Sequence, residues 1–170
     1  LKSNVAVLID FGIIVSTKII NYFPKGIINS HFSLLPELRG ADPISFAILE
    51  GKKETGVSLM LLVEAMDEGP ILSYGTLPVS NSIKSTELTD QLINLSDELL
   101  ENTIPKYLSG DIYPKDQENL CAERKMDYRP TYSRKITKLD GVINWQKTAQ
   151  QLDREIRTFV TWPKSHTTLE

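Results

Sequence analysis

The chain of 170 residues is long enough to bury a core, and its 41% hydrophobic and 24% charged residues are typical of a globular protein. No run approaches the roughly 18 apolar residues of a membrane-spanning helix, and two histidines with one cysteine provide neither a zinc cluster nor an internal disulfide. The net charge is −3, and together these features argue against a membrane partner and a metal centre and favour a reducing, cytoplasmic setting.

The first elements expected along the chain are two buried strands joined by a short helix. Residues 5–9 form a continuous apolar run of strand length, which suits a sheet covered on both faces. Ser16 can cap a helix that reaches about residue 22 and ends before Pro24, and a strand follows over residues 27–29. A strand, a helix and a second strand predict a parallel βαβ unit and an α/β fold.

Two polar residues stand at the carboxyl end of the second strand. Asn29 and His31 lie two positions apart, so their side chains face the same side of a strand. An amide can hold the oxygen of a carbonyl under attack while an imidazole moves a proton. In open α/β sheets the ligand crevice lies outside the carboxyl ends of the strands. We therefore interpret both residues as catalytic candidates; the alternative is a structural His31 whose hydrogen bonds are satisfied within the protein.

The next residues predict a helix and a hairpin. Residues 43–50 are expected to form a helix with Pro43 in its first turn, and strands follow over residues 54–63 and 71–79. The turn Met66-Asp67-Glu68-Gly69-Pro70 joins the two strands and brings Asp67 near the tip of the hairpin. From the local sequence, Asp67 is either a functional carboxylate or a turn residue that makes local hydrogen bonds.

The second half of the chain predicts two helices separated by a linker. Leucines recur at helical spacing over residues 86–108, which indicates an amphipathic helix that Gly110 ends. Residues 111–127 are polar, and we expect an irregular linker there. Thr148 and Gln151 match the capping-box pattern at the start of the second helix. Its predicted buried stripe consists of Ala149, Leu152, Ile156 and Phe159.

The C-terminal tract differs from the rest of the chain in charge. Residues 120–170 carry 10 Lys+Arg against 6 Asp+Glu, whereas residues 1–119 carry 9 against 16. The excess makes this tract a candidate for contact with a polyanion, and the alternative is an ordinary solvated basic face. The cationic side chains that cluster within 15 residues are Arg124, Lys125, Arg129, Arg134, Lys135 and Lys138.

Several motifs resemble the signature of the 10-formyltetrahydrofolate-dependent formyltransferases. The first is Asn29-x-His31-x-Ser33-Leu34-Leu35-Pro36, followed by Arg39-Gly40-Ala41-x-Pro43-Ile44. Thr55-Gly56-Val57 with Met66-Asp67-x-Gly69-Pro70-Ile71 is similar to the family's second motif, whose aspartate partners the catalytic histidine. Phe11-Gly12-Ile13-Ile14 resembles the aromatic-Gly loop that lines the folate pocket, although the family usually has Tyr where this chain has Phe11.

The resemblance extends to the C-terminal tract and implies a domain plan. Asp140-Gly141-x-Ile143-x-Trp145 and Ile156-Arg157-x-Phe159, with Trp162-Pro163, resemble the opening of the β-rich, tRNA-binding C-terminal domain in members that act on tRNA. Asn144 departs from the usual Asp. The implied plan is a Rossmann-like α/β domain with a mostly parallel sheet over residues 1–110, a linker over 111–127 and the start of the C-terminal domain over 128–170. The first strands of the sheet would precede Leu1, and most of the second domain would follow Glu170.

The resemblance also implies a reaction and a role for each site residue. A formyl group would pass from 10-formyltetrahydrofolate to the methionine amine of initiator methionyl-tRNA, a step of translation initiation that needs no metal. Asn29 and protonated His31 would stabilise the oxyanion, while Asp67 would orient His31 and help carry the proton to the leaving nitrogen. The implied folate contacts are Phe11, Gly12, Ile13, Ser33, Leu34, Leu35 and Pro36. The expected tRNA contacts are Arg39, Arg134, Lys135 and Lys138, in a monomer.

Two other functions stay open at this point. The trio of Asn29, His31 and Asp67 fits hydrolysis of formyltetrahydrofolate, or formylation of a sugar or ribonucleotide amine, as well as it fits a tRNA-directed reaction. The chain could also be a non-catalytic fragment that binds folate or tRNA. The segment 39–44 and the C-terminal tract favour the tRNA-directed reaction.

Overall fold

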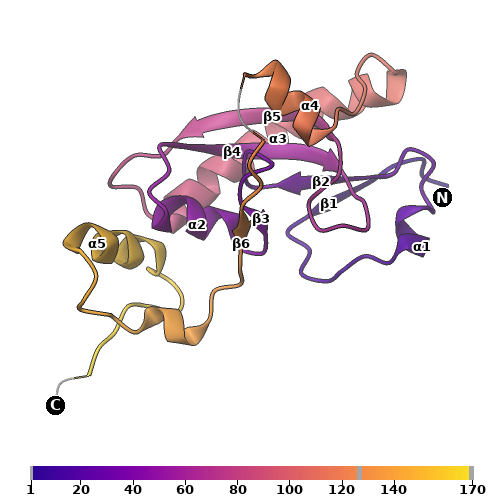
Figure 1. Cartoon of the computed structure of the whole chain (residues 1–170). Coiled ribbons are helices and arrows are strands. Elements are labelled where there is room, and N and C mark those ends of the chain that lie inside the picture. The colour runs from indigo at the N-terminus through magenta and orange to yellow at the C-terminus, as the bar shows by residue number, and fades with distance from the viewer. Residues whose placement is uncertain (1, 126–127, 169–170) are drawn as a thin grey trace.

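A four-stranded sheet forms the centre of the protein, and its strands follow the order β1-β2-β4-β5 (Figure 1). The computed structural model describes residues 2–125 and 128–168. As predicted, β1 (Ala6–Ile9) and β2 (Ile27–His31) are parallel and are joined through the short helix α1 (Thr17–Ile20). The α/β class expected from the sequence is therefore confirmed.

The sheet is mixed, however, and the expected predominance of parallel pairing is wrong for the described strands. β4 (Glu54–Leu61) runs antiparallel to both of its neighbours, β2 and β5 (Ile71–Pro78). The short connection 62–70 explains the second pairing, because parallel neighbours need a crossover of about a dozen residues or more. The predicted hairpin with Asp67 in its turn is thereby confirmed.

Both faces of the sheet are covered, by different helices. Leu59 and Met60 are adjacent in β4, so their side chains point to opposite faces, and both are fully buried. The face of Leu59 packs against α3 (Ser85–Ser109), together with α2 (Pro43–Leu49). On the other face, Met60 and Ile71 pack against Leu35 and Leu120. In the described ranges, no helix combines the length and the apolar character that crossing a membrane requires.

Leu120 belongs to a helix that the sequence analysis missed. Residues 111–127 were expected to form an irregular linker, but α4 (Gln117–Glu123) lies within them. The side chains of Gln117, Leu120 and Cys121 are buried, so this helix covers part of the sheet instead of connecting two domains loosely. Residues 126–127, at the end of the expected linker, lie outside the described residues, and the domain boundaries themselves stay a prediction.

The C-terminal part is connected to the segment after β2 by a short strand pair, which forms a second, two-stranded sheet (Figure 1). β6 (Tyr132–Ser133) runs parallel to β3 (Arg39–Gly40). Gly40 has a positive φ of 103°, and a Cβ at this position would lie 2.2 Å from the carbonyl oxygen of Ser133. Because only glycine permits so close an approach, the pairing of β3 with β6 depends on this residue.

Two short elements complete the chain, the 3-10 turn η1 (Lys138–Gly141) and helix α5 (Ala149–Thr158), which packs beside α2. The predicted capping box is confirmed. The Thr148 hydroxyl accepts from the backbone N–H of Gln151, and Oε1 of the Gln151 side chain accepts from the backbone N–H of Thr148. The predicted buried stripe is only partly correct. Phe159 is buried, but Ile156 is 54% exposed. The helix meets the preceding domain with its arginine side instead, and Arg157 donates to the carbonyl of Ile83.

Candidate active site

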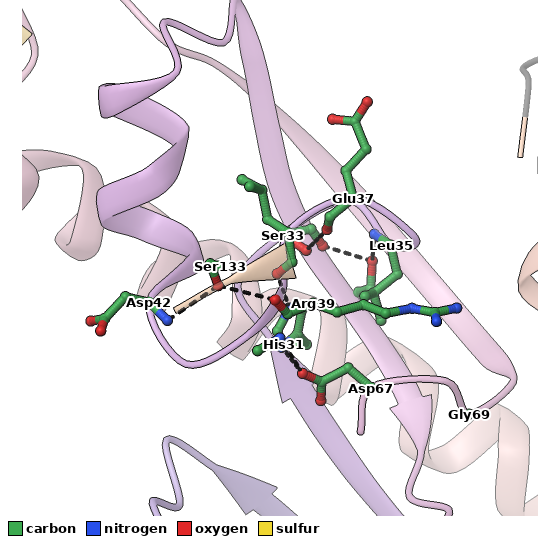
Figure 2. A network of polar contacts seen from close by, with 12 residues as sticks. His31, Ser33, Leu35, Glu37, Arg39, Asp42, Asp67, Gly69 and Ser133 are labelled. Atoms are coloured by element: carbon green, nitrogen blue, oxygen red, sulfur yellow. Dashed lines mark hydrogen bonds and ion pairs between the residues drawn. The ribbon is translucent and has the colours of Figure 1, made fainter. Parts of the chain in front are cut away.

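The three predicted catalytic residues meet at the wall of one cavity. Asn29 and His31 come from the carboxyl end of β2, and Asp67 comes from the turn between β4 and β5. All three line a cavity of about 310 Å³, which lies within the usual size range for small-molecule sites. Figure 2 shows the side chain of Asp67 directed toward His31. Residues about forty positions apart are thus brought together, and their catalytic roles stay a prediction.

The geometry around His31 fixes which ring nitrogen is available for chemistry. The imidazole is 6% exposed, and its Nε2 lies 2.9 Å from the carbonyl oxygen of Leu38. A carbonyl can only accept, so Nε2 carries a proton and donates it to that bond. Nδ1 is then the nitrogen left for a substrate, and it lies 3.7 Å from Oδ2 of Asp67. That separation is longer than a hydrogen bond, so the carboxylate acts on the ring through its charge.

Asp67 is held by backbone geometry as well as by hydrogen bonds. Its φ is +54°, in the left-handed region that Asp tolerates better than most residues. Gly69 completes the turn, and a Cβ there would lie 1.7 Å from the carbonyl oxygen of Leu61. Oδ2 of Asp67 accepts from the backbone N–H of Gly40 at 2.7 Å. A tight turn and an amide donor from β3 therefore aim the carboxylate at the cavity.

The outer wall of the cavity is apolar and faces solvent. The predicted folate loop contributes Phe11, Gly12 and Ile13 to the lining. Ile13 is 72% exposed, and Met66, which precedes Asp67 in the turn, is 57% exposed. Large apolar side chains left uncovered beside a cavity indicate a ligand with a flat or apolar part.

The other predicted folate segment, residues 33–36, does not line this cavity. Ser33, Leu35 and Pro36 are buried, and Leu34 is partly buried. The Ser33 hydroxyl donates to the carbonyl of Glu37, and the backbone N–H of Leu35 donates to the hydroxyl of Ser58. These bonds shape the loop that brings the Leu38 carbonyl to His31. A direct contact of residues 33–36 with folate stays a prediction that the geometry does not favour.

The tRNA contact predicted for Arg39 stays a prediction that the geometry does not favour, because the residue is only 2% exposed. Its guanidinium donates to the hydroxyls of Tyr132 and Tyr128 and to Oε1 of Gln117, and it pairs with Glu68 at 2.9 Å. Burial alone would lower the pKa of Arg39, but the hydrogen bonds to the two tyrosines outweigh it and raise the pKa. The residue therefore ties β3 to α4 and β6.

The other three predicted tRNA contacts lie at the surface, although one of them already has a partner. Arg134 makes two hydrogen bonds to the carboxylate of Asp140, which lower the pKa of that carboxyl well below its ordinary value. Its guanidinium also lies over the ring of Phe46, 5.8 Å from the centroid. Lys135 and Lys138 are exposed. These two lysines are better placed than Arg134 to meet a phosphate.

Sequence reasoning missed two contributors to the site. Gly40 supplies an amide to Asp67, and Gln117 donates to the carbonyls of Asp67 and Gly69. Gly40 belongs to a motif that was recognised, but nothing in its residue type shows that its N–H has a carboxylate partner. Gln117 lay in the expected linker, where the apolar spacing of Leu120 and Cys121 was the available signal for a helix.

Comparison with known proteins identifies relatives of both parts of the chain. The family model described as formyl transferase matches residues 1–104, and the model of the formyl transferase C-terminal domain matches residues 135–170. The methionyl-tRNA formyltransferase of Enterococcus faecalis is 36% identical over the whole chain, which covers 52% of that protein. The corresponding protein of Nitratidesulfovibrio vulgaris is 34% identical over 98% of the chain, which covers 48% of it.

Solved structures agree on the fold. An N-formyltransferase from Helicobacter canadensis, in complex with folinic acid and dTDP-3-aminofucose, superposes with a TM-score of 0.75 at 21% identity. The match covers 94% of this chain and 56% of that one. At this identity the likeness shows the fold alone. The chain spans about half the length of the curated relatives it matches.

Proposed function

This chain belongs to the formyl transferase family, and on that premise we propose that it acts in the transfer of a formyl group from 10-formyltetrahydrofolate to the methionine amine of initiator methionyl-tRNA. The observation that carries the proposal is the convergence of Asn29, His31 and Asp67 on one cavity with an exposed apolar wall. Their spacing in the sequence and their meeting in space fit a single acyl-transfer site.

The first step assigned to these residues is stabilisation of charge. The acceptor amine attacks the formyl carbon, a new C–N bond forms, and negative charge develops on the formyl oxygen. The Asn29 amide and a protonated Nδ1 of His31 are the donors for that oxyanion. Oδ2 of Asp67 lies 3.7 Å from Nδ1, and we assign this carboxylate to orient the ring.

The second step is proton transfer and loss of the leaving group. The attacking nitrogen loses a proton, and N10 of the folate must gain one as its bond to the formyl carbon breaks. His31 and Asp67, the two titratable residues of the cavity wall that lie side by side, are assigned to carry that proton. No covalent intermediate with the protein is required.

The donor is assigned to the cavity between the 11–14 loop and the Asp67 turn. Folate contains a flat pteridine ring with an apolar face, and Phe11, Ile13 and Met66 are exposed where such a ring would cover them. The structure from Helicobacter canadensis is described with folinic acid, a formylated folate, which supports this class of donor.

The acceptor is assigned on different grounds. Curated relatives at 34% and 36% identity over nearly the whole chain are methionyl-tRNA formyltransferases, whereas the sugar N-formyltransferase above shares 21% identity. The exposed Lys135 and Lys138 lie in the basic tract and suit contact with tRNA phosphates. A methionyl-tRNA acceptor also fits a cytoplasmic protein.

The test is a formyl-transfer assay with labelled 10-formyltetrahydrofolate and three acceptors in parallel: initiator methionyl-tRNA, a dTDP-amino sugar and water. We expect transfer to methionyl-tRNA to exceed the other two by orders of magnitude. Transfer to the sugar amine, or hydrolysis alone, would overturn the acceptor assignment and retain the formyl chemistry. If the folded protein binds folate but transfers no formyl group to any acceptor, the assignment as an enzyme fails.

A further inference from the structure

Gln117 is hydrogen-bonded to the backbone of the Asp67 turn, although the reaction described above gives this residue no role. It is the first residue of α4 and is 4% exposed. Its Nε2 donates to the carbonyl oxygen of Asp67 at 2.7 Å and to that of Gly69 at 3.0 Å. A side-chain amide nitrogen has two N–H groups, so both are used on the carbonyls that flank Glu68.

The opposite end of the same amide is tied to β3. Oε1 of Gln117 accepts from Nη2 of Arg39 at 2.7 Å. Arg39 is followed by Gly40, whose N–H donates to the Asp67 carboxylate. Figure 2 shows the Arg39 side chain extending from β3 toward the turn that carries Gly69. The turn is therefore fixed at its backbone by α4 and at its side chain by β3, and the Arg39–Gln117 bond joins the two.

The start of α4 is itself anchored next to the turn. Lys115 and Ile71 exchange two backbone hydrogen bonds of 2.7 and 2.8 Å, which attach this segment to the first residue of β5. Leu120 and Cys121 are buried one turn further along the helix. Gln117 thus reaches the Asp67 turn from a packed element whose position is set independently of the turn.

We propose that Gln117 is a positioning residue, which fixes the backbone of Asp67 so that the carboxylate stays directed at Nδ1 of His31. The inference rests on the proposed function, because it assigns Gln117 to the same site. Asp67 has a positive φ, a sparsely populated conformation that persists only where surrounding contacts determine it. Without the two donated hydrogen bonds the turn would relax, and its carboxylate would move away from the imidazole.

The test uses Gln117→Glu in the whole protein. Glutamate has nearly the same shape and can still accept from Arg39, but it has no N–H to donate to the two carbonyls. We expect kcat for formyl transfer to fall about 10- to 100-fold, as displacement of a catalytic group by about 1 Å does, with folate affinity close to wild type. Gln150→Glu makes the same charge change at an exposed position near the start of α5 and should leave kcat unchanged.

A double-mutant cycle separates positioning from a general loss of structure. If Gln117 acts through Asp67, then Gln117→Glu should cause little further loss of kcat in the Asp67→Asn background. Losses that multiply would mean that Gln117 does not act through Asp67, and this outcome would overturn the inference. Wild-type kcat in Gln117→Glu itself would do the same.

Hydrogen exchange gives a readout that does not depend on the acceptor. The Gly40 amide donates to the Asp67 carboxylate, while the amides of Arg39 and Ala41 donate to the 131–133 segment. In Gln117→Glu we expect the Gly40 amide to exchange about tenfold faster or more, with Arg39 and Ala41 unchanged as internal controls. Unchanged exchange at Gly40 would contradict the positioning role. If the wild-type protein transfers no formyl group, the proposed function fails and this measurement alone decides the role of Gln117.

Discussion

The orientation of His31 is decided by the Leu38 carbonyl and not by its closest carboxylate. Because Nε2 donates to that carbonyl, the ring presents Nδ1 to the cavity, and Asp67 lies 3.7 Å from this nitrogen. The local sequence allowed Asp67 to be a simple turn residue, and the structure shows that it makes the turn and reaches the site at once. The structural and functional alternatives for these residues therefore do not exclude each other.

At this scale we predict that His31→Ala and Asn29→Ala each reduce kcat for formyl transfer by about 10²-fold or more, because each removes a donor to the developing oxyanion. Asp67→Asn should be similarly damaging, because it removes the negative charge beside Nδ1 of His31. Steady-state kinetics with a thermal-shift titration of a stable formyl-folate analogue would measure both effects. Folate affinity should change little, since the apolar wall is intact.

The matched control is His166→Ala, which removes the other histidine of the chain from an exposed position in the C-terminal part. Its kcat should stay at the wild-type value. Near-wild-type turnover in His31→Ala or Asn29→Ala would refute the assignment of the trio.

Among the elements, η1 depends on one carboxylate. Asp140 accepts from the backbone N–H and the hydroxyl of Thr137 and from the guanidinium of Arg134. The hydrogen bonds from Arg134 are the largest cause of the lowered pKa of Asp140, whose ordinary value is 3.8. Since the folded protein holds this proton less tightly than the unfolded chain does, the stabilisation is present above pH 3.8 and is lost as the pH falls below it.

We predict that Asp140→Asn destabilises the fold by about 1–2 kcal/mol at pH 7, the usual size for loss of a charged cap. The difference from wild type should shrink as the pH falls below about 4, where the wild-type carboxyl begins to take up its proton in the unfolded chain. Urea unfolding at several pH values measures this difference. Asp97→Asn, at an exposed site within α3, should show no such dependence. A difference that stays constant down to pH 3 would contradict the role given to Asp140.

At the scale of the whole molecule, the acidic and basic parts of the chain are joined beside the site. β6 pairs with β3, and the hydroxyl of Tyr132 in β6 accepts from the Arg39 guanidinium and donates to the Glu68 carboxylate. The surface lysines of the basic tract therefore follow directly on a strand that contacts the Asp67 turn. A tRNA bound by that tract would lie close to the cavity, whereas the apolar wall to which we assign folate belongs to the acidic part.

We predict that the tRNA affinity of the whole protein falls steeply with salt, because each phosphate contact releases counterions. Charge reversal at both lysines, Lys135→Glu with Lys138→Glu, should weaken tRNA binding. It should also flatten the slope of log affinity against log salt concentration by about 1–2 units. Arg134 is left intact because Asp140 already occupies its guanidinium. Fluorescence anisotropy with initiator tRNA over a salt series measures the slope.

Reversal of Lys2 and Lys18, two exposed lysines of the acidic part, is the matched control and should leave the slope unchanged. Folate binding should be the same in all variants. An equal slope in wild type and in the Lys135 and Lys138 variant would assign these residues to an ordinary solvated face.

The sequence by itself determined the class of fold and the candidate residues that meet at the cavity. Apolar runs and turn residues predicted β1, β2 and the hairpin, because these signals are local. The separation of two residues placed Asn29 and His31 on one face of a strand. The Gly-Pro turn placed Asp67 at the tip of the hairpin. The capping box of α5 was equally readable, since its two partners stand three residues apart.

Only the tertiary structure decided what depends on contacts between distant residues. The sheet became mixed because the 62–70 connection is short, and the expected linker became helical because Leu120 and Gln117 found buried partners on the sheet. Arg39 looked like a surface cation, yet four side chains from elsewhere in the chain surround its guanidinium. A buried polar group needs hydrogen-bond partners, and no local sequence pattern predicts partners that lie about 80 residues away.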